Sequence, residues 1–192
     1  MLGAASTSEA MMENTPTADA TTVHETPAAD AMETTLEPPM QMAVWLGTPL
    51  ADAVTGRGFQ VADHQGKVVL VETMAVWCTN CRAQQEQMRA FQSRMMEQTT
   101  DLVLVSLDID PNENVETLKK YVNATGFAWP FAVAPPDLIR TIGLTYGDQF
   151  LNPPSTPVLI IDRHGEAHPL PFGIKSTEDL MQAVQPYLEA AG

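Results

Sequence analysis

Apolar residues gather in short, dense runs from residue 67 onward. Three of these runs are rich in Val, Ile and Leu with few polar residues between, at 67–73, 101–108 and 157–162. Runs of this kind predict strands that are buried on both faces of a sheet. Shorter strands are expected at 50–54, 58–62, 130–133 and 166–171.

The segments between these strands carry apolar residues at helical spacing. Met88, Phe91 and Met95 lie on one face of a helix expected over about 79–98. Three more helices are expected, at about 113–124, at 137–142 and from near Ser176. Pro186 should kink or weaken the last helix, because proline lacks the N–H that a helix interior uses. This order of elements predicts an α/β protein with a mixed sheet.

The charge of the chain argues against some partners. With 24 acidic and 10 basic residues, the 192-residue chain has a net charge of −14. Such a charge disfavours nucleic acid or an anionic membrane surface as a partner. The length suffices for one ordinary domain with its own core.

Residues 1–43 differ from the rest in composition. They hold seven acidic residues and no Lys or Arg, and they consist mostly of Ala, Thr, Glu, Met and Pro. A segment so poor in Ile, Val and Phe cannot bury enough apolar surface to offset the entropy lost on ordering. We predict a disordered acidic linker at 1–43 and a folded domain at 44–192. Such a linker is typical of proteins tethered outside the cytoplasm, although the sequence shows neither a signal peptide nor a membrane span.

The chain has two cysteines, in the stretch Val76-Trp77-Cys78-Thr79-Asn80-Cys81. They follow a predicted strand and begin a predicted helix, so Cys78 should lie at an exposed helix N-terminus. Unpaired backbone N–H groups and the helix dipole stabilise a thiolate there, which lowers the thiol pKa and makes the thiol reactive. Cys81 lies one turn further on, close enough to form a disulfide with Cys78.

Other interpretations of the cysteines stay open beside the redox-active pair that we favour. A purely structural disulfide would close too small a loop to add much stability. Structural zinc usually has four Cys or His ligands. His164 and His168 have ligand-like spacing, but the turn sequence Arg163-His164-Gly165 favours a hairpin there. Inert thiols are a further alternative.

The region from Val68 to Cys81 resembles the active-site region of the thioredoxin superfamily, in which a Trp precedes the first cysteine. The additional strand–helix–strand before Pro157 is similar to the TlpA/ResA/CcmG branch, whose members are membrane-tethered thiol–disulfide oxidoreductases. The resemblance covers about residues 46–190. It implies a thioredoxin-like three-layer α/β/α sandwich with a central mixed sheet, an extra N-terminal β-hairpin and a strand–helix insert. The chain departs from the branch at Gln84, where ResA-like members often carry an acid.

The resemblance also implies roles for individual residues. Cys78 would be the attacking thiol and Cys81 the resolving thiol. Pro157 would be a cis-proline facing the disulfide. Trp77 and Thr156 would bind the substrate, with the backbone of Thr156 left free to pair with the substrate chain. A proline that opens a buried strand gives up a ladder donor, which agrees with a special role.

Glu72 is a charged residue in an otherwise apolar strand. Burial of an unpaired carboxylate favours its neutral form, so we expect a raised pKa. Thioredoxin has a buried carboxylate at the matching position, where it moves protons for the resolving cysteine. By that resemblance Glu72 is a candidate general base for Cys81. The alternative is a strand-end glutamate whose side chain reaches solvent.

The function expected from these residues is thiol–disulfide exchange. The Cys78–Cys81 pair would act as a reductant of extracytoplasmic protein substrates and draw electrons from a membrane donor. We expect a monomer with no cofactor beyond the redox-active disulfide, no metal and no nucleic acid. The competing hypothesis is a copper chaperone resembling Sco proteins, with a third ligand from His164 or the methionines of residues 1–43. Peroxidase chemistry is less favoured, because the cysteines lack a peroxiredoxin-type sequence setting.

Removal of residues 1–43 should leave the melting temperature unchanged, because a disordered segment makes no contacts that stabilise the fold. The measurement is thermal unfolding of the full chain and of a variant that begins at Val44, at the same pH and concentration. A loss of several degrees in the shortened protein would show that the segment packs on the domain.

Overall fold

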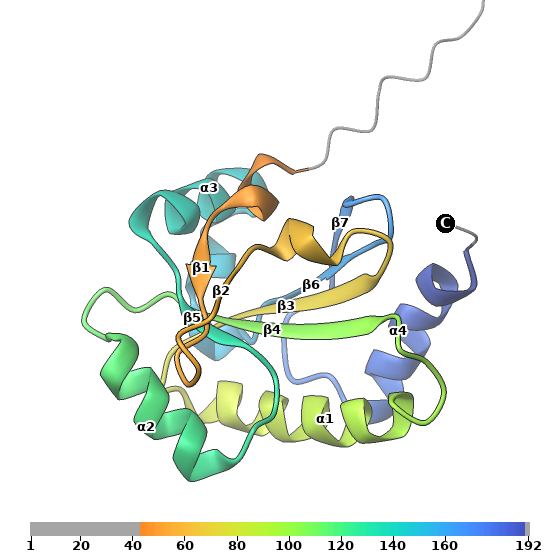
Figure 1. Cartoon of the computed structure of the whole chain (residues 1–192), viewed down its shortest axis with the longest axis horizontal. Coiled ribbons are helices and arrows are strands. Elements are labelled where there is room, and N and C mark those ends of the chain that lie inside the picture. Colours follow the sequence, from red (N-terminus) through yellow and green to blue (C-terminus); the bar gives the residue numbers. More distant parts are fainter. Residues whose placement is uncertain (1–42, 191–192) are drawn as a thin grey trace, which may run out of the picture. The chain divides into compact units, whose positions relative to one another are not determined.

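A computed structural model describes residues 43–190, so all of the predicted linker except Ala43 lies outside the described residues. The described chain folds around a five-stranded sheet with strand order β5-β4-β3-β6-β7 (Figure 1). The strands are β3 (Val68–Met74), β4 (Leu102–Asp108), β5 (Phe131–Val133), β6 (Val158–Ile161) and β7 (Ala167–Pro169). The three long apolar runs of the sequence thus become the three central strands, as predicted.

The sheet is mixed, with β3 at its centre. β3 and β4 run parallel, as do β4 and β5, whereas β6 is antiparallel to both β3 and β7. In the register of β3 with β6, Glu72 lies opposite Val158 and Val69 lies opposite Ile161. The start of β6 therefore lies beside the end of β3 that leads to the cysteines.

Helices cover both faces of the sheet, and every residue of β3 is buried. Leu70 and Met74 belong to one apolar cluster with side chains of α1 (Thr79–Met95), α2 (Val115–Thr125) and α4 (Thr177–Glu189). Val69 and Val71 belong to a second cluster with α3 (Pro136–Tyr146). Figure 1 shows these helices on opposite sides of the sheet. The structure is thus the expected three-layer α/β/α sandwich of the thioredoxin-like class.

The N-terminal part of the domain forms a small antiparallel hairpin of β1 (Leu50–Ala51) and β2 (Gly58–Phe59). Both strands are shorter than predicted. β1 ends early because the Asp52 carboxylate accepts hydrogen bonds from the backbone and hydroxyl of Thr55 and turns the chain. Residues expected to extend β2 form a 3₁₀ helix instead, η2 (Val61–His64), and another, η1 (Val44–Gly47), precedes the hairpin.

The predicted helix boundaries hold with local corrections. α2 ends where Gly126 adopts a left-handed conformation with φ of 70°, as the stop signal in the sequence predicts. α3 is longer than expected, because Pro136 begins the helix and it continues to Tyr146. α4 continues past Pro186 to Glu189, so this proline, close to the helix end, does not terminate it.

Two short 3₁₀ helices, η3 (Asp148–Leu151) and η4 (Pro153–Ser155), connect α3 to β6. η4 packs against α1, the helix that begins with the cysteines. No helix within residues 43–190 is long and apolar enough to cross a membrane.

Candidate active site

Cys78 and Cys81 form a disulfide at the N-terminus of α1, with their Cα atoms 5.3 Å apart. Cys78 is the N-cap residue, and the backbone N–H of Cys81 donates a hydrogen bond to its Sγ over 3.0 Å. A helix N-terminus offers such N–H groups to an anion, so this sulfur occupies a position that favours a thiolate. The predicted pairing and its place at the helix start are confirmed.

The expectation that Cys78 is exposed is wrong for this disulfide form. Cys78 is 2% exposed and Cys81 is fully buried. η4 lies against the pair, with Cys81 Sγ 3.2 Å from the carbonyl oxygen of Pro153. The Asn80 side chain also donates to the Pro154 carbonyl over 3.0 Å. Sequence spacing could not show this cover, because η4 follows the cysteines by more than 70 residues.

The loop that precedes β6 contacts the cysteine motif through Pro153 and Pro154, and the place of Pro157 opposite the disulfide stays a prediction. The backbone N–H of Thr73, the residue after Glu72, donates to the Pro157 carbonyl over 3.3 Å. Trp77, the residue before Cys78, is 57% exposed. Its indole N–H donates to the Asp110 carboxylate over 2.5 Å, which fixes the ring beside Cys78. The cis geometry of Pro157 stays a prediction.

The expectation that the backbone of Thr156 is free for a substrate is wrong in this structure. Its N–H donates to the Pro153 carbonyl over 2.8 Å. Its carbonyl oxygen accepts a hydrogen bond from the Lys175 ammonium over 2.5 Å. Thr156 is also the one non-glycine residue with positive φ, at 48°, in the part of the chain that the structure describes. Both of its main-chain groups are thus already in use.

Glu72 is fully buried, so the alternative of a solvent-reaching glutamate is wrong. Its Oε2 accepts hydrogen bonds from Gln85 Nε2 and Ser106 Oγ, each over 2.9 Å, while Oε1 has no partner among the described residues. Burial raises the pKa of Glu72 to about 7, although these two bonds and the charge of Lys175 act to lower it. A carboxyl group with this pKa can both accept and donate a proton near neutral pH.

Sequence reasoning missed the side chains that surround Glu72. Gln85 lies one helical turn after Cys81, and its amide oxygen accepts a hydrogen bond from Tyr121. Ser106, which is the β4 partner of Glu72 in the sheet, accepts a hydrogen bond from the indole of Trp129 over 3.0 Å. Polar residues in a helix face or strand that is otherwise apolar were the available signal, but their partners depend on the tertiary packing.

Sequence reasoning also missed Lys175, which is only 7% exposed. Its ammonium donates to the carbonyl oxygens of Thr156 and Gly173, over 2.5 and 2.7 Å. Gln84 binds its backbone on both sides, accepting from Lys175 N–H over 2.7 Å and donating to its carbonyl over 3.2 Å. Burial lowers the pKa of Lys175 to about 8, and the charge of Glu72 opposes this shift. Gln84, noted as a departure from the family, thus positions a cation.

A second acidic group lies beside the cysteine motif. Asp108, at the end of β4, is fully buried, and burial raises its pKa to about 8, with the neighbouring Glu113 acting in the same direction. Glu113 accepts a hydrogen bond from the backbone N–H of Val76 over 2.7 Å. Glu113 therefore holds the segment just before Cys78, while Asp108 accepts a hydrogen bond from the backbone N–H of Asp110.

His164 lies far from the cysteines. It occupies the turn after β6, at the end of the sheet where Val69 pairs with Ile161. The seven residues of β3 separate that end from the cysteine end, a distance of roughly 20 Å at ~3.3 Å per residue. His168 pairs with Asp162 in the same hairpin, over 2.9 Å. A copper site that joins His164 to Cys78 and Cys81 does not fit this fold.

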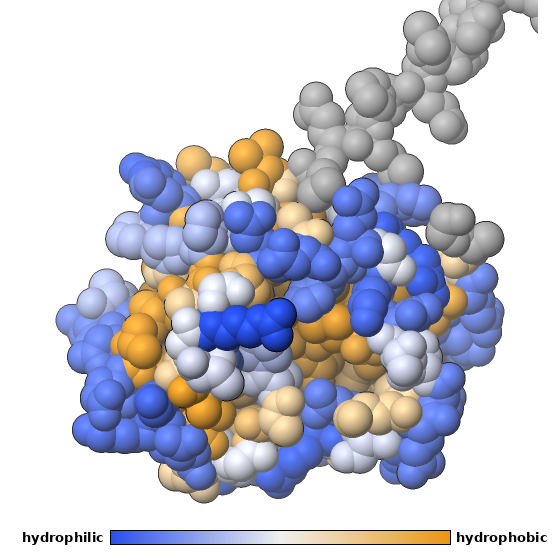
Figure 2. Space-filling view, viewed as in Figure 1, coloured by the Kyte–Doolittle hydropathy of each residue, from blue (hydrophilic) through white to orange (hydrophobic). Residues whose placement is uncertain are grey.

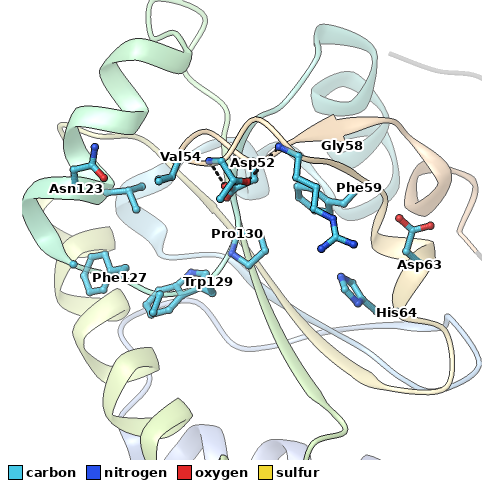
Figure 3. A pocket seen from close by; sticks show the side chains of 15 residues that line it. Asp52, Val54, Gly58, Phe59, Asp63, His64, Asn123, Phe127, Trp129 and Pro130 are labelled. Atoms are coloured by element: carbon cyan, nitrogen blue, oxygen red, sulfur yellow. Dashed lines mark hydrogen bonds between the residues drawn. The ribbon is translucent and has the colours of Figure 1, made fainter.

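A pocket of about 700 Å³ opens between the hairpin and the segment after α2 (Figure 3). Figure 3 shows Phe127 and Trp129 on one side of it and Asp63 and His64 on the other. In Figure 2 apolar side chains surround a hollow on this face of the molecule. Neither cysteine lines the pocket, so the chemistry of the disulfide lies elsewhere. Trp129 nevertheless connects it with Glu72 through Ser106.

Comparison with solved structures places the fold among thioredoxin-family proteins. A thiol:disulfide interchange protein of the thioredoxin family from Chlorobium tepidum TLS is 26% identical, with a TM-score of 0.60 over 73% of this chain and 94% of that one. A SCO1/SenC family lipoprotein from Bacillus anthracis matches with 21% identity and a TM-score of 0.60, over 74% and 93% of the two chains. A secreted disulfide oxidoreductase from Mycobacterium tuberculosis, homologous to E. coli DsbE, matches with 14% identity and a TM-score of 0.58, over 73% and 96%.

No protein-family model and no curated protein matches the chain. The fold, the cysteine pair and the structural neighbours together make the chain a member of the thioredoxin superfamily. Its general kind is that of the thioredoxin-like disulfide oxidoreductases.

Replacement of Glu72 by Gln should stabilise the protein at pH 8 and change little at pH 4. The folded state holds the Glu72 proton more tightly than the unfolded chain, because burial raises the pKa from 4.5 to about 7. The favourable contribution of this proton is complete below pH 4.5 and is lost as the pH rises through 7. The difference amounts to about 3 kcal/mol at most.

The measurement is the free energy of unfolding in urea between pH 4 and pH 8, for wild type and Glu72→Gln. Glu86→Gln is a matched control, because Glu86 lies on the surface of α1 in ion pairs with Arg82 and Arg89. Parallel pH profiles for wild type and Glu72→Gln would contradict a buried, titrating Glu72.

Proposed function

We propose that the protein is a thiol–disulfide oxidoreductase of the TlpA/ResA kind that reduces disulfides in extracytoplasmic proteins. The observation that carries the proposal is the Cys78–Cys81 disulfide at the start of α1, with a buried carboxyl group of raised pKa on the adjoining strand. A disulfide that spans two residues adds little stability, so a structural role does not account for it. Its position at a helix start, where a thiolate is stabilised, suits thiol–disulfide exchange instead.

In the proposed reaction, the Cys78 thiolate of the reduced protein attacks one sulfur of the substrate disulfide. A mixed disulfide forms, and the other substrate sulfur leaves as a thiolate that takes up a proton. The Cys81 thiolate then attacks Cys78 Sγ, which closes the Cys78–Cys81 disulfide and releases the second substrate thiolate. The substrate gains two electrons, and the protein loses two.

Glu72 is proposed as the general base that takes the proton from Cys81. Its carboxylate binds Gln85, which lies four residues after Cys81 and so on the same face of α1. With a pKa of about 7, the carboxylate is ionised in about half of the molecules at neutral pH and is a competent proton acceptor. Asp108 is also fully buried, but it is Glu72 whose carboxylate is hydrogen-bonded to a side chain of α1.

Apolar groups near the disulfide suit a protein as the substrate. Trp77 is 57% exposed, Ile174 49% and Phe172 40%. The loop that carries Phe172 and Ile174 binds the segment before Pro157, because the Gly173 N–H donates to the Ser155 carbonyl over 2.9 Å. Exposed apolar side chains around a reactive group are typical of a docking surface for another chain.

The location and electron source are proposed from the neighbours. One is a lipoprotein and another is secreted. A protein tethered at the outer face of a membrane needs a donor that carries electrons across that membrane, which agrees with the expected membrane electron donor. The reducing direction and a monomeric state are part of this proposal.

Substitution of Cys81 by Ser should trap a mixed disulfide between Cys78 and a substrate protein, because the resolving thiol is missing. Cys78→Ser should trap none. The test incubates each variant, reduced, with a protein disulfide such as insulin and separates the products on a non-reducing gel. Trapping by Cys78→Ser alone would reverse the two roles, and trapping by neither variant would contradict exchange.

Copper transfer is the second candidate, because a SCO1/SenC family protein is among the structural neighbours. The cysteine spacing differs, since Sco-like proteins carry three residues between the cysteines. The position of His164 at the far end of β3 disfavours it further.

The reduced protein should therefore lose Cu(I) on dialysis against a competing chelator, and His164→Ala should behave as wild type. Copper and protein are quantified after dialysis in the wild type, in His164→Ala and in Cys78→Ser. Tight, stoichiometric copper that is retained by the wild type and lost in His164→Ala would favour the chaperone instead.

A further inference from the structure

Thr156, the residue before Pro157, has an unusual local environment. Its φ of 48° and ψ of 59° are left-handed, a region that β-branched residues rarely adopt. Its hydroxyl group is buried and has no hydrogen-bond partner among the described residues. A residue that precedes proline prefers an extended conformation. Three features of Thr156 therefore oppose the conformation that it has.

Two hydrogen bonds hold the main chain of Thr156 in this conformation, one to the Pro153 carbonyl and one from Lys175. Its ammonium is buried and donates to the Thr156 carbonyl over 2.5 Å. The backbone of Lys175 is fixed on both sides by Gln84 of α1. The side chain of Lys175 can therefore move while its backbone stays in place. A charged hydrogen bond in a buried setting is among the stronger bonds of a protein.

The same bond prevents main-chain pairing with a substrate. A residue pairs with a neighbouring strand through an N–H and a C=O that point to the same side in an extended backbone. Thr156 is not extended, its N–H is bound to Pro153, and its C=O is bound to Lys175. A substrate strand cannot pair with Thr156 in this state.

We propose that Lys175 is a positioning residue that holds Thr156 in the left-handed conformation, in which it cannot pair with a substrate strand. A substrate chain pairs with Thr156 after the Lys175 ammonium releases the Thr156 carbonyl oxygen. Release lets Thr156 take the extended conformation that a residue before proline prefers. The proposal rests on the proposed function, because it concerns how a substrate of that reaction docks. Lys175 touches no reacting sulfur, so it should act on substrate affinity and not on the attack of Cys78. Its charge lowers the pKa of Glu72, which serves Cys81 in the later step.

The test compares two disulfides that share one leaving group. The first is a short peptide whose single cysteine carries 2-nitro-5-thiobenzoate, and the second is 5,5′-dithiobis(2-nitrobenzoate), which has no peptide backbone. Each is mixed in excess with pre-reduced full-length protein, and the coloured thiolate is followed in a single turnover. The dependence of the rate on peptide concentration gives a half-saturating concentration and a maximal rate.

Lys175→Met should lower the half-saturating peptide concentration by about tenfold, the effect of one charged hydrogen bond that no longer competes. The maximal rate and the rate with 5,5′-dithiobis(2-nitrobenzoate) should stay within about twofold. Lys175→Gln, which keeps a neutral donor, should lie between Lys175→Met and wild type. Lys67→Met is the matched control, because Lys67 also donates to a backbone carbonyl, that of Thr100, at the far end of β3.

The wild-type protein supplies a measurement that needs no variant to fold. The charged groups around Lys175 are Glu72 of β3, whose charge raises the pKa of Lys175, and Asp179 of α4, which lines a pocket together with Lys175. Because the pKa of Lys175 is about 8, its ammonium loses a proton as the pH rises through that value. The half-saturating peptide concentration of the wild type should therefore fall between pH 7 and pH 9, and that of Lys175→Met should not.

The outcomes separate this proposal from the proposed function. A higher half-saturating concentration in Lys175→Met would show that Lys175 holds the segment open for substrate, and an unchanged one would show no part in docking. Equal losses with both disulfides would place Lys175 in the chemical step or the fold. Each of these results overturns the proposed role of Lys175, while the proposed thiol–disulfide exchange is unaffected. If the wild-type protein released thiolate from neither disulfide, the proposed function would be overturned, and the proposed role of Lys175 with it.

Discussion

The site depends on one carboxyl group that the fold removes from water. Glu72 lies in the central strand between two helical layers, where transfer of a carboxylate from water is costly. Two neutral hydrogen bonds and the charge of Lys175 offset only part of this, so burial dominates and the pKa rises to about 7. The protein thereby keeps, next to the helix of the cysteine pair, an acid that exchanges protons at neutral pH.

The same constraint explains the arrangement around it. A buried carboxylate favours a cation nearby, and the structure supplies Lys175 from the loop before α4. The ammonium of Lys175 in turn binds the carbonyl of Thr156, in the segment that lies against the disulfide. The charge of Lys175 thus acts on the proton acceptor Glu72, while its ammonium is hydrogen-bonded to the proposed docking segment. A change of charge at one of them acts on the others, because the surroundings screen charges poorly.

The sequence predicts the fold well because buried strands and amphipathic helices leave strong local patterns. It also singles out Cys78, Cys81 and Glu72, whose chemistry is conspicuous in an apolar setting. It does not reveal Lys175, which reaches Thr156 across 19 residues of chain. A lone lysine has no periodicity, and exposure is its usual state. The cover of Cys78 by η4 and the engaged backbone of Thr156 escape prediction for the same reason, since each depends on contacts between distant segments.

The reduction potential of the Cys78–Cys81 couple, measured by equilibration with defined ratios of reduced and oxidised dithiothreitol, tests the reducing role. A reductant should show a reversible two-electron couple with a potential near that of thioredoxin, about −270 mV. A potential near that of the oxidant DsbA, about −120 mV, would contradict the reducing direction. A pair that does not equilibrate reversibly with the buffer would contradict the redox role itself.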